Sequence, residues 1–265
     1  MTPEEHERFT RRLVAGVEAD SRVLGVVGLG STAAAQPAPD RWSDHDVWLV
    51  VQDGAQERFR TDVSWLPDAD QIAWWHRETE HGLGVVYRSG HLVECAVFAT
   101  HELAVARANR ARVLLDRDGI AEHIAALQAR TAGSTAAERP GTRWLFGQLL
   151  VGLVVASSRW ARGERLSAQR RILDAVGHLA QLLAAELPSA ESHLLDDLDP
   201  LRRVERVWPA VGAELDRAVL LPAPAAAGQL VATVRSALAP LPAAHLEALA
   251  VVARLAAAAA TARPG

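Results

Sequence analysis

The ten residues Trp-Ser-Asp-His-Asp-Val-Trp-Leu-Val-Val at positions 42–51 join two acids to a strongly apolar run. From residue 45 to residue 51 the run is rich in β-branched and apolar side chains, which predicts a β-strand. Asp44 and Asp46 stand two positions apart where that strand begins, and such side chains lie on the same side of a sheet. The sequence therefore predicts two neighbouring carboxylates at the end of a strand.

Two ionised carboxylates at close range repel each other unless a cation lies between them. Mg²⁺ prefers oxygen ligands, so it is the cation that we expect Asp44 and Asp46 to hold. The preceding strand-like run, residues 23–29, ends in Gly30-Ser31, a turn whose amide groups and hydroxyl suit phosphate oxygens. We expect metal and phosphate to share this end of the sheet.

A third acid interrupts a later apolar run. Glu94 stands within residues 92–98, and an unpaired ionised side chain inside a protein is costly. The position therefore favours a metal or a charged partner. The alternative is a glutamate on an edge strand that faces solvent. For the two aspartates the alternative is a turn or helix cap before the strand.

The first half of the chain combines helical and strand-like patterns. Phe9, Leu13 and Val17 recur at helical spacing and predict an amphipathic helix. Several β-branched runs follow, separated by turn residues, and a loop with Pro37 and Pro39 joins the first two. These patterns predict a mixed sheet, with helices at residues 3–19 and 55–66 and strands at residues 23–29, 45–51, 72–77, 83–88 and 92–98.

The second half is helical by its pattern. Leu-, Ala- and Val-rich segments with helical period are interrupted by prolines, and the small residues from Ala132 to Pro140-Gly141 indicate a boundary. We expect an α+β fold with a mixed-sheet domain at residues 1–135 and a helical bundle at residues 136–265. The expected helices span residues 144–162, 168–187 and 201–220, with a linker at residues 222–228.

Composition narrows the classes of function. A chain of 265 residues with a formal net charge of −4 has no general attraction to nucleic acid or to anionic membranes, so we expect a small-molecule partner. All basic residues except histidine are arginine, which excludes a Gly-Lys-Ser/Thr phosphate loop and a lysine Schiff base. The single cysteine, Cys95, excludes an intramolecular disulfide. With no signal peptide expected, these features favour the cytoplasm.

The combination of Gly30-Ser31, a loop, Ser43-Asp44-His45-Asp46 and a later strand acid resembles the nucleotidyltransferase fold of the DNA polymerase β superfamily. It resembles the antibiotic-modifying branch in particular. In the second half, residues 144–147 and the segment Arg159-Trp-Ala-Arg-Gly-Glu164 look like the long helix and Arg-Gly-Glu turn of lincosamide nucleotidyltransferases. The resemblance covers most of the chain, with its strongest motifs in residues 30–46.

The resemblance implies a role for each of these motifs. Asp44 and Asp46 would hold two Mg²⁺ ions, and Glu94 would be a third ligand or the base for the acceptor hydroxyl. Gly30-Ser31 would cradle the triphosphate of an NTP, and Arg162 of the Arg-Gly-Glu turn would bind a phosphate oxygen. The implied reaction moves a nucleoside monophosphate, with ATP as the expected donor, onto a hydroxyl of a small molecule such as a lincosamide.

Other functions stay open at this point. An aminoglycoside adenylyltransferase would need an acidic cleft for its polycationic substrate, and Asp196, Asp197, Asp199 and Glu205 are candidates that equally suit helix caps. A non-catalytic, antitoxin-like binding protein is a second alternative. The presence of all three acids, Asp44, Asp46 and Glu94, argues against it. Transfer to a protein side chain is a third, and the sequence also leaves a homodimer open.

Overall fold

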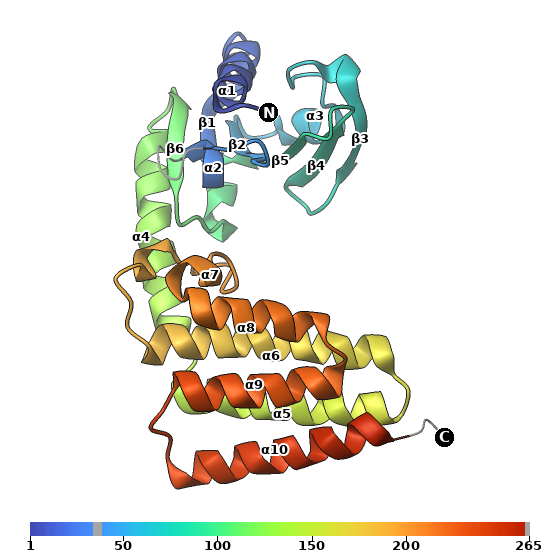
Figure 1. Cartoon of the computed structure of the whole chain (residues 1–265). Helices are drawn as coiled ribbons and strands as arrows, with labels where there is room; N and C mark the ends of the chain where they lie inside the picture. Colours follow the sequence, from blue (N-terminus) through green and yellow to red (C-terminus); the bar gives the residue numbers. More distant parts are fainter. Residues whose placement is uncertain (34–38, 263–265) are drawn as a thin grey trace. The chain divides into compact units, whose positions relative to one another are not determined.

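The computed structural model describes residues 1–33 and 39–262, without the side chains of residues 135–138. The expected loop through Pro37 thus lies partly outside the described residues. The chain divides into two compact units, Met1–Ala137 and Glu138–Gly265. The first contains a mixed sheet and the second is helical, which confirms the predicted α+β class (Figure 1).

The sheet of the first unit has six strands in the order β3-β4-β5-β2-β1-β6. Only β2 and β5 pair in parallel among these neighbours, and the other pairs are antiparallel. The five predicted strands are confirmed to within one residue at each end, whereas the edge strand β6 was not predicted. The strands are β1 (Val23–Leu29), β2 (His45–Val51), β3 (Ile72–Arg77), β4 (Gly82–Tyr87), β5 (Leu92–Ala99) and β6 (Ala111–Asp116).

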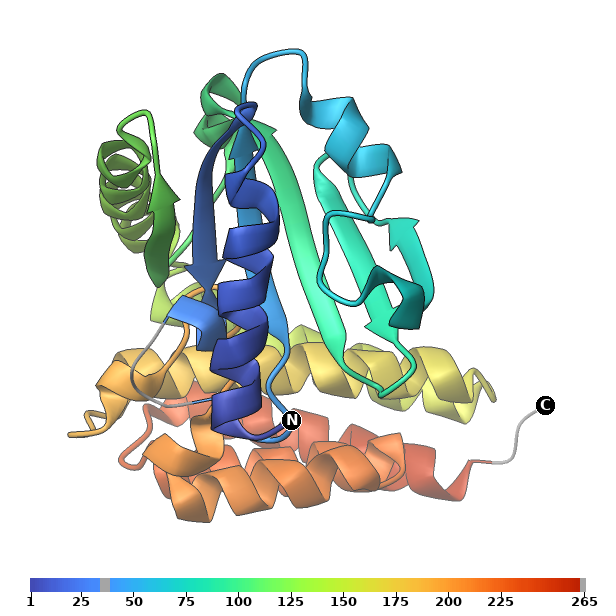
Figure 2. The ribbon, with the colours of Figure 1, turned by 90° about the horizontal axis from the view of Figure 1, so that it is seen from above.

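Helices cover the two faces of this sheet. Successive side chains of β2 point to opposite faces, so Leu49 packs in the same core as Leu13 of α1 (Pro3–Glu18). Trp48 and Val50 pack in a separate core with Ile120 of α4 (Ile120–Glu138). Figure 2 shows α1 lying along its face of the sheet. A short helix, α3 (Gln56–Thr61), occupies part of the segment predicted as helix at residues 55–66.

The second unit contains α5 (Thr142–Ala161), α6 (Arg165–Glu186), α7 (Val204–Val207), α8 (Pro209–Leu220), α9 (Ala223–Ala237) and α10 (Ala243–Thr261). The predicted helix at residues 201–220 is divided where Pro209 begins α8. The linker predicted at residues 222–228 is wrong, because Pro224 occupies the first turn of α9, where proline is tolerated. The small residues from Ala132, which were expected to indicate a boundary, belong to α4.

Two helices, α5 and α10, are long and apolar enough to cross a membrane by length and composition alone. Within their most apolar windows, 39% of α5 and 22% of α10 is buried inside the protein. Core helices of soluble proteins pass the same test, so two such helices are weak evidence for a membrane protein. Leu145, Leu149 and Leu153 of α5 are fully buried in the core of the helical unit, as in a core helix.

The contact between β1 and α4 leads to a stability prediction. A Cβ atom at Gly25 would lie 2.8 Å from Cγ1 of Ile120, whose side chain is fully buried. Gly25→Ala should therefore reduce the free energy of unfolding by roughly 1–3 kcal/mol, measured by urea denaturation. Gly133→Ala in α4 is the control, because a Cβ there meets nothing within 4 Å. Equal stability of Gly25→Ala and the wild type would contradict this packing.

Candidate active site

Strand pairing brings three acids together at one end of the sheet. In the parallel register of β2 and β5, Asp46 stands opposite Glu94, and Asp44 immediately precedes β2. One carboxylate oxygen from each residue lies within 4.8 Å of the other two. Two adjacent strands of a buried sheet thus fix the separation of the carboxylates.

This donor set fits a hard divalent cation. Three carboxylates at such separations repel one another when ionised, and a bound cation offsets that repulsion. Each of the three supplies an oxygen, the ligand type that Mg²⁺ takes, and the half-buried Asp44 and Asp46 together with the exposed Glu94 leave room for bound water. The residues present therefore suit Mg²⁺, as the nucleotidyltransferase resemblance implies.

The burial of Glu94 differs from the expectation. Its side chain is exposed, so the cost of burying an unpaired charge does not explain this acid. The solvent-facing edge strand that was the alternative is not found either, because β5 lies between β4 and β2 inside the sheet. Glu94 is an exposed carboxylate on an inner strand, and its distance to Asp44 and Asp46 carries its assignment.

The Gly30-Ser31 turn directly follows β1 and begins the short helix α2 (Gly30–Ala33). Gly30 has φ +49°, and a Cβ atom there would lie 2.5 Å from Oδ2 of Asp46. A side chain at this position would displace the aspartate, so glycine is required by both conformation and space. The Ser31 hydroxyl donates to the carbonyl of Asp44 at 3.1 Å, which ties the turn to the carboxylates. With that proton engaged, the amide groups of the turn are the donors left for a phosphate.

Two residues that the sequence did not single out also hold the aspartates. Nε2 of His6 lies 2.9 Å from the carbonyl oxygen of Asp44, and the amide of Asp46 donates to the Thr32 hydroxyl at 3.3 Å. Thr32 follows the Gly-Ser pair, so its position was a usable signal. Nothing local to His6 indicates its role, because the contact depends on how α1 packs on the sheet.

Neutral histidines support the other face of the strand. His45 is fully buried, its ring stacks on that of His6 with centroids 3.7 Å apart, and its Nδ1 lies 2.9 Å from Nε2 of His91. Burial, followed by the nearby His6, lowers the pKa of His45 to about 3 and that of His91 to about 4. His45 and His91 therefore hold the start of β2 in place without adding a positive charge beside the acids.

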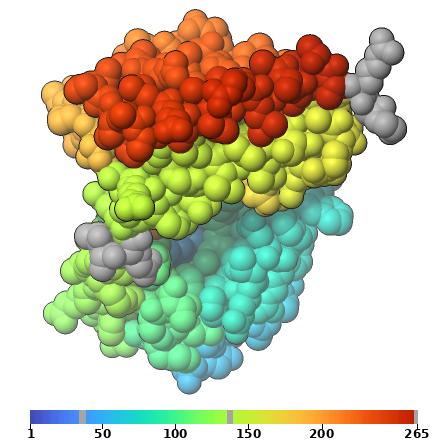
Figure 3. All heavy atoms as spheres, turned by 90° about the horizontal axis from the view of Figure 1, so that it is seen from below, coloured from blue at the N-terminus to red at the C-terminus, as the bar shows by residue number. Residues whose placement is uncertain are grey.

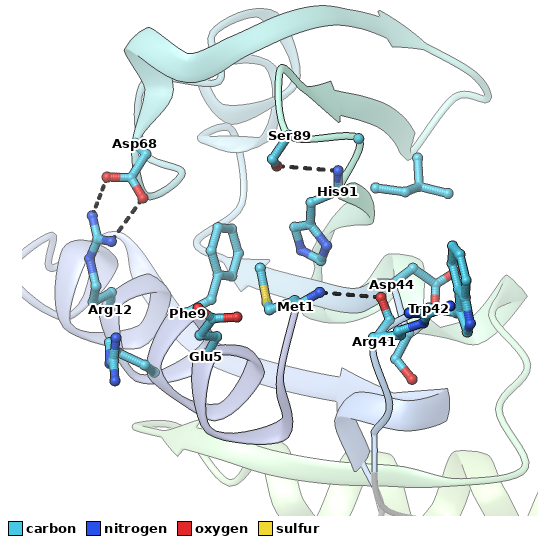
Figure 4. Close-up of a pocket in the computed structure, with 14 residues that line it drawn as sticks. Met1, Glu5, Phe9, Arg12, Arg41, Trp42, Asp44, Asp68, Ser89 and His91 are labelled. Atoms are coloured by element: carbon cyan, nitrogen blue, oxygen red, sulfur yellow. Dashed lines mark hydrogen bonds and ion pairs between the residues drawn. The ribbon is translucent and has the colours of Figure 1, made fainter.

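A pocket of about 710 Å³ lies beside Asp44 in the first unit (Figure 4). The N-terminal part of α1, the segment before β2 and the turn between β4 and β5 line it. Asp44 and His91 are in its lining, whereas Asp46 and Glu94 are not. Its charged side chains are those of Glu5, Arg8, Arg12, Arg41, Asp44 and Asp68, so the pocket is mixed in charge rather than acidic.

The remaining site candidate belongs to the helical unit. Arg162 caps the C-terminus of α5, is exposed, and donates from Nε to Glu164 at 2.7 Å. This ion pair raises the pKa of Arg162 and lowers that of Glu164. A role of Arg162 in binding phosphate stays a prediction. Of the acids considered for an acidic cleft, Asp197 pairs with Arg139 at 2.6 Å and Asp199 accepts from the Leu201 amide at 3.2 Å.

No protein-family model matches the chain, and no curated protein matches it significantly. Among solved structures, an aminoglycoside 6-adenyltransferase from Bacillus subtilis is 13% identical, with a TM-score of 0.32 and coverage of 97% of this chain and 98% of that one. A chain of the CdnC:HORMA-deltaN complex of E. coli MS115-1 is 14% identical, with a TM-score of 0.29 and coverage of 96% and 89%. Similarities this distant assign neither an activity nor a substrate to this chain.

The carboxylate cluster predicts metal-dependent stability. Mg²⁺ or Mn²⁺ at about ten times its dissociation constant should raise the melting temperature of the wild type by about 2–4 °C. Asp44→Asn should remove most of this shift and, without metal, should melt no lower than the wild type, because one repelling charge is gone. Asp53→Asn, at an exposed aspartate outside the cluster, is the control. An unchanged metal shift in Asp44→Asn would sink the metal assignment.

The histidine cluster predicts loss of stability in acid. His91 has a lower pKa folded than unfolded, so the unfolded chain binds more protons as the pH falls from about 6.5 toward 4. The stability contributed by neutral His91 is therefore full above that window and is lost on descending through it. His91→Gln should reduce the slope of stability against pH by up to about one proton in this window, measured by denaturation at several pH values. An identical slope in variant and wild type would refute this.

Proposed function

We propose that the protein is a Mg²⁺-dependent nucleotidyltransferase, which moves a nucleoside monophosphate from an NTP onto a hydroxyl of a small molecule. The observation that carries the proposal is the cluster of Asp44, Asp46 and Glu94 within 4.8 Å, beside a Gly-Ser turn. ATP is the favoured donor. The proposed setting is the cytoplasm, with neither nucleic acid nor a membrane as a partner.

Each part of the site has a task in this reaction. Asp44 and Asp46 would hold Mg²⁺, which neutralises charge on the triphosphate and on the leaving group. The amide groups of the Gly30-Ser31 turn suit the phosphate oxygens. The acceptor oxygen forms a bond to the α-phosphorus, the bond to the β-phosphate oxygen breaks, and pyrophosphate leaves.

Glu94 is suited to take the proton of the acceptor hydroxyl. Its side chain is exposed while an oxygen stays within 4.8 Å of both aspartates, so a bound acceptor can approach it from solvent. The protein otherwise acts mainly by positioning, because phosphoryl transfer needs alignment and charge neutralisation more than covalent catalysis.

A lincosamide is the acceptor that the sequence resemblance favours. An aminoglycoside needs a predominantly acidic binding surface, and the pocket beside Asp44 balances three arginines against three carboxylates. Asp197 and Asp199 are also already engaged within the helical unit. A non-catalytic binding protein would have no need to keep three repelling carboxylates together.

A direct test is mass spectrometry of purified protein with Mg²⁺ and each NTP, against lincosamides, aminoglycosides and other hydroxylated metabolites. The expected result is an acceptor whose mass rises by one nucleoside monophosphate, with release of pyrophosphate. Self-modification of the protein would instead indicate transfer to a side chain. No product with any NTP and acceptor, from protein that binds Mg²⁺ through the cluster, would count against catalysis.

Glu94→Gln separates catalysis from nucleotide binding. If Glu94 takes the proton, its loss should lower kcat by roughly 10²- to 10⁴-fold with little change in NTP affinity, and the acidic limb of the kcat/KM profile should vanish. If Glu94 is only a metal ligand, raised Mg²⁺ should restore part of the activity. Glu78→Gln, at an exposed glutamate between β3 and β4, is the control. Near-wild-type activity of Glu94→Gln would remove Glu94 from the site.

A further inference from the structure

The helix α10 carries a face that no other described helix of the helical unit covers. One side, with Leu249, Val252 and Ala256, is buried where α10 packs against α5 and α9. Yet only 22% of its most apolar window is buried. Figure 3 shows the atoms of α10 forming a continuous stretch of the molecular surface. The helix is therefore apolar on both sides but packed on one.

The exposed side of α10 contains a stripe of residues at its centre, whose positions recur every three or four residues. Two of its members are charged, and a threonine lies at its end. The others are alanine or valine. We call this stripe the α10 face, and its exposed residues are Ala243, Glu247, Val251, Arg254, Ala257, Ala258 and Thr261. The exposed Ala244, Leu246 and Ala260 flank it.

The two charges on the α10 face have no partner within the described part of the helical unit. Glu247 and Arg254 are seven residues apart, about 10 Å along one line of the helix. Residues three and four positions from either one are alanine or valine, so neither has an intrahelical ion-pair partner. Among the described side chains of the helical unit, 139–262, no ion pair is found for them. An acid and a base are left without partners on an apolar stripe.

We propose that the α10 face binds a second copy of this chain, with the two α10 helices antiparallel about a two-fold axis between Ala250 and Val251. Glu247 and Arg254 stand equally far on either side of that point. An antiparallel copy therefore sets each Glu247 opposite the Arg254 of the other copy, twice over. The alanines allow the two helices to approach closely. A two-fold interface must be self-complementary, and the pairing of Glu247 with Arg254 of the other copy meets this requirement.

The placement of the charges favours a second copy over a membrane surface. Helices that lie in a membrane interface keep their charged residues on the side away from the lipid. Here Glu247 and Arg254 lie within the apolar stripe, where lipid would desolvate both without pairing them. A contact of one 19-residue helix with its copy is small, so we expect an association that depends on protein concentration.

Charge exchange tests the pairing directly by sedimentation equilibrium over micromolar to submillimolar protein. Glu247→Arg or Arg254→Glu places like charges opposite each other at both symmetric positions, and each should weaken dimerisation by about tenfold or more. The double variant restores opposite charges and should return to within about threefold of the wild type. Melting curves of each variant report whether the fold is intact.

Cysteine crosslinking tests the geometry. Val251→Cys lies beside the proposed two-fold axis, so its two copies should crosslink with a short bis-maleimide. The two copies of Ala258→Cys would be about 22 Å apart along the helix direction and should not crosslink. The natural Cys95 is buried, which keeps the background low.

Several results would overturn the proposal. The wild type could be monomeric at every concentration, or the single charge variants could dimerise as strongly as the wild type. The double variant could be folded and still dimerise weakly, or the two cysteine variants could crosslink equally. Co-sedimentation of monomeric wild type with phosphatidylglycerol vesicles would assign the face to membranes instead.

Discussion

The parallel pairing of β2 with β5 is the constraint on which the candidate site depends. It sets Asp46 opposite Glu94, while the antiparallel pairing with β1 sets Leu29, and hence the Gly30 turn, beside the same aspartate. Opposed carboxylates favour separation of the strands, so the register must be held elsewhere. The pairs farther along, such as Leu49 with Val97, are fully buried. Apolar burial along the strands therefore stabilises an arrangement that is repulsive at their ends.

The start of β2 has different chemistry on its two faces. Asp46 points toward the acidic cluster, and the adjacent His45 points into the core beneath α1, as alternation along a strand requires. Burial keeps His45 and His91 neutral, so they position the strand through hydrogen bonds and ring contacts rather than through charge. A cationic histidine there would weaken the attraction of the cluster for a metal ion. The position of the aspartates thus depends in part on two neutral side chains that add no net charge.

Local pattern was enough to predict most of the sheet and the neighbouring aspartates, because a strand's side-chain direction follows from its period alone. Gly30 was recognised beside Ser31, although its reason, the approach of Asp46, needs the β1–β2 pairing. What local pattern missed depends on distant contacts: β6 pairs at an edge, and His6 reaches Asp44 only once α1 is packed. The exposure of Glu94 likewise depends on what covers the end of an inner strand, which no single segment encodes.

The helices α5 and α10 show that composition alone does not predict the role of a helix either. By composition both could span a membrane, yet Leu149 of α5 is fully buried in a core while Val251 of α10 is 47% exposed. Hydrophobicity alone therefore does not say whether a helix is a core element, an anchor or an interface. The position of the charged residues distinguishes these roles. Charges placed symmetrically on an otherwise apolar stripe are costly in lipid and unexplained in a monomer, but they are complementary between two antiparallel copies. Since the acids and α10 belong to different units, assembly and the candidate chemistry can be altered separately.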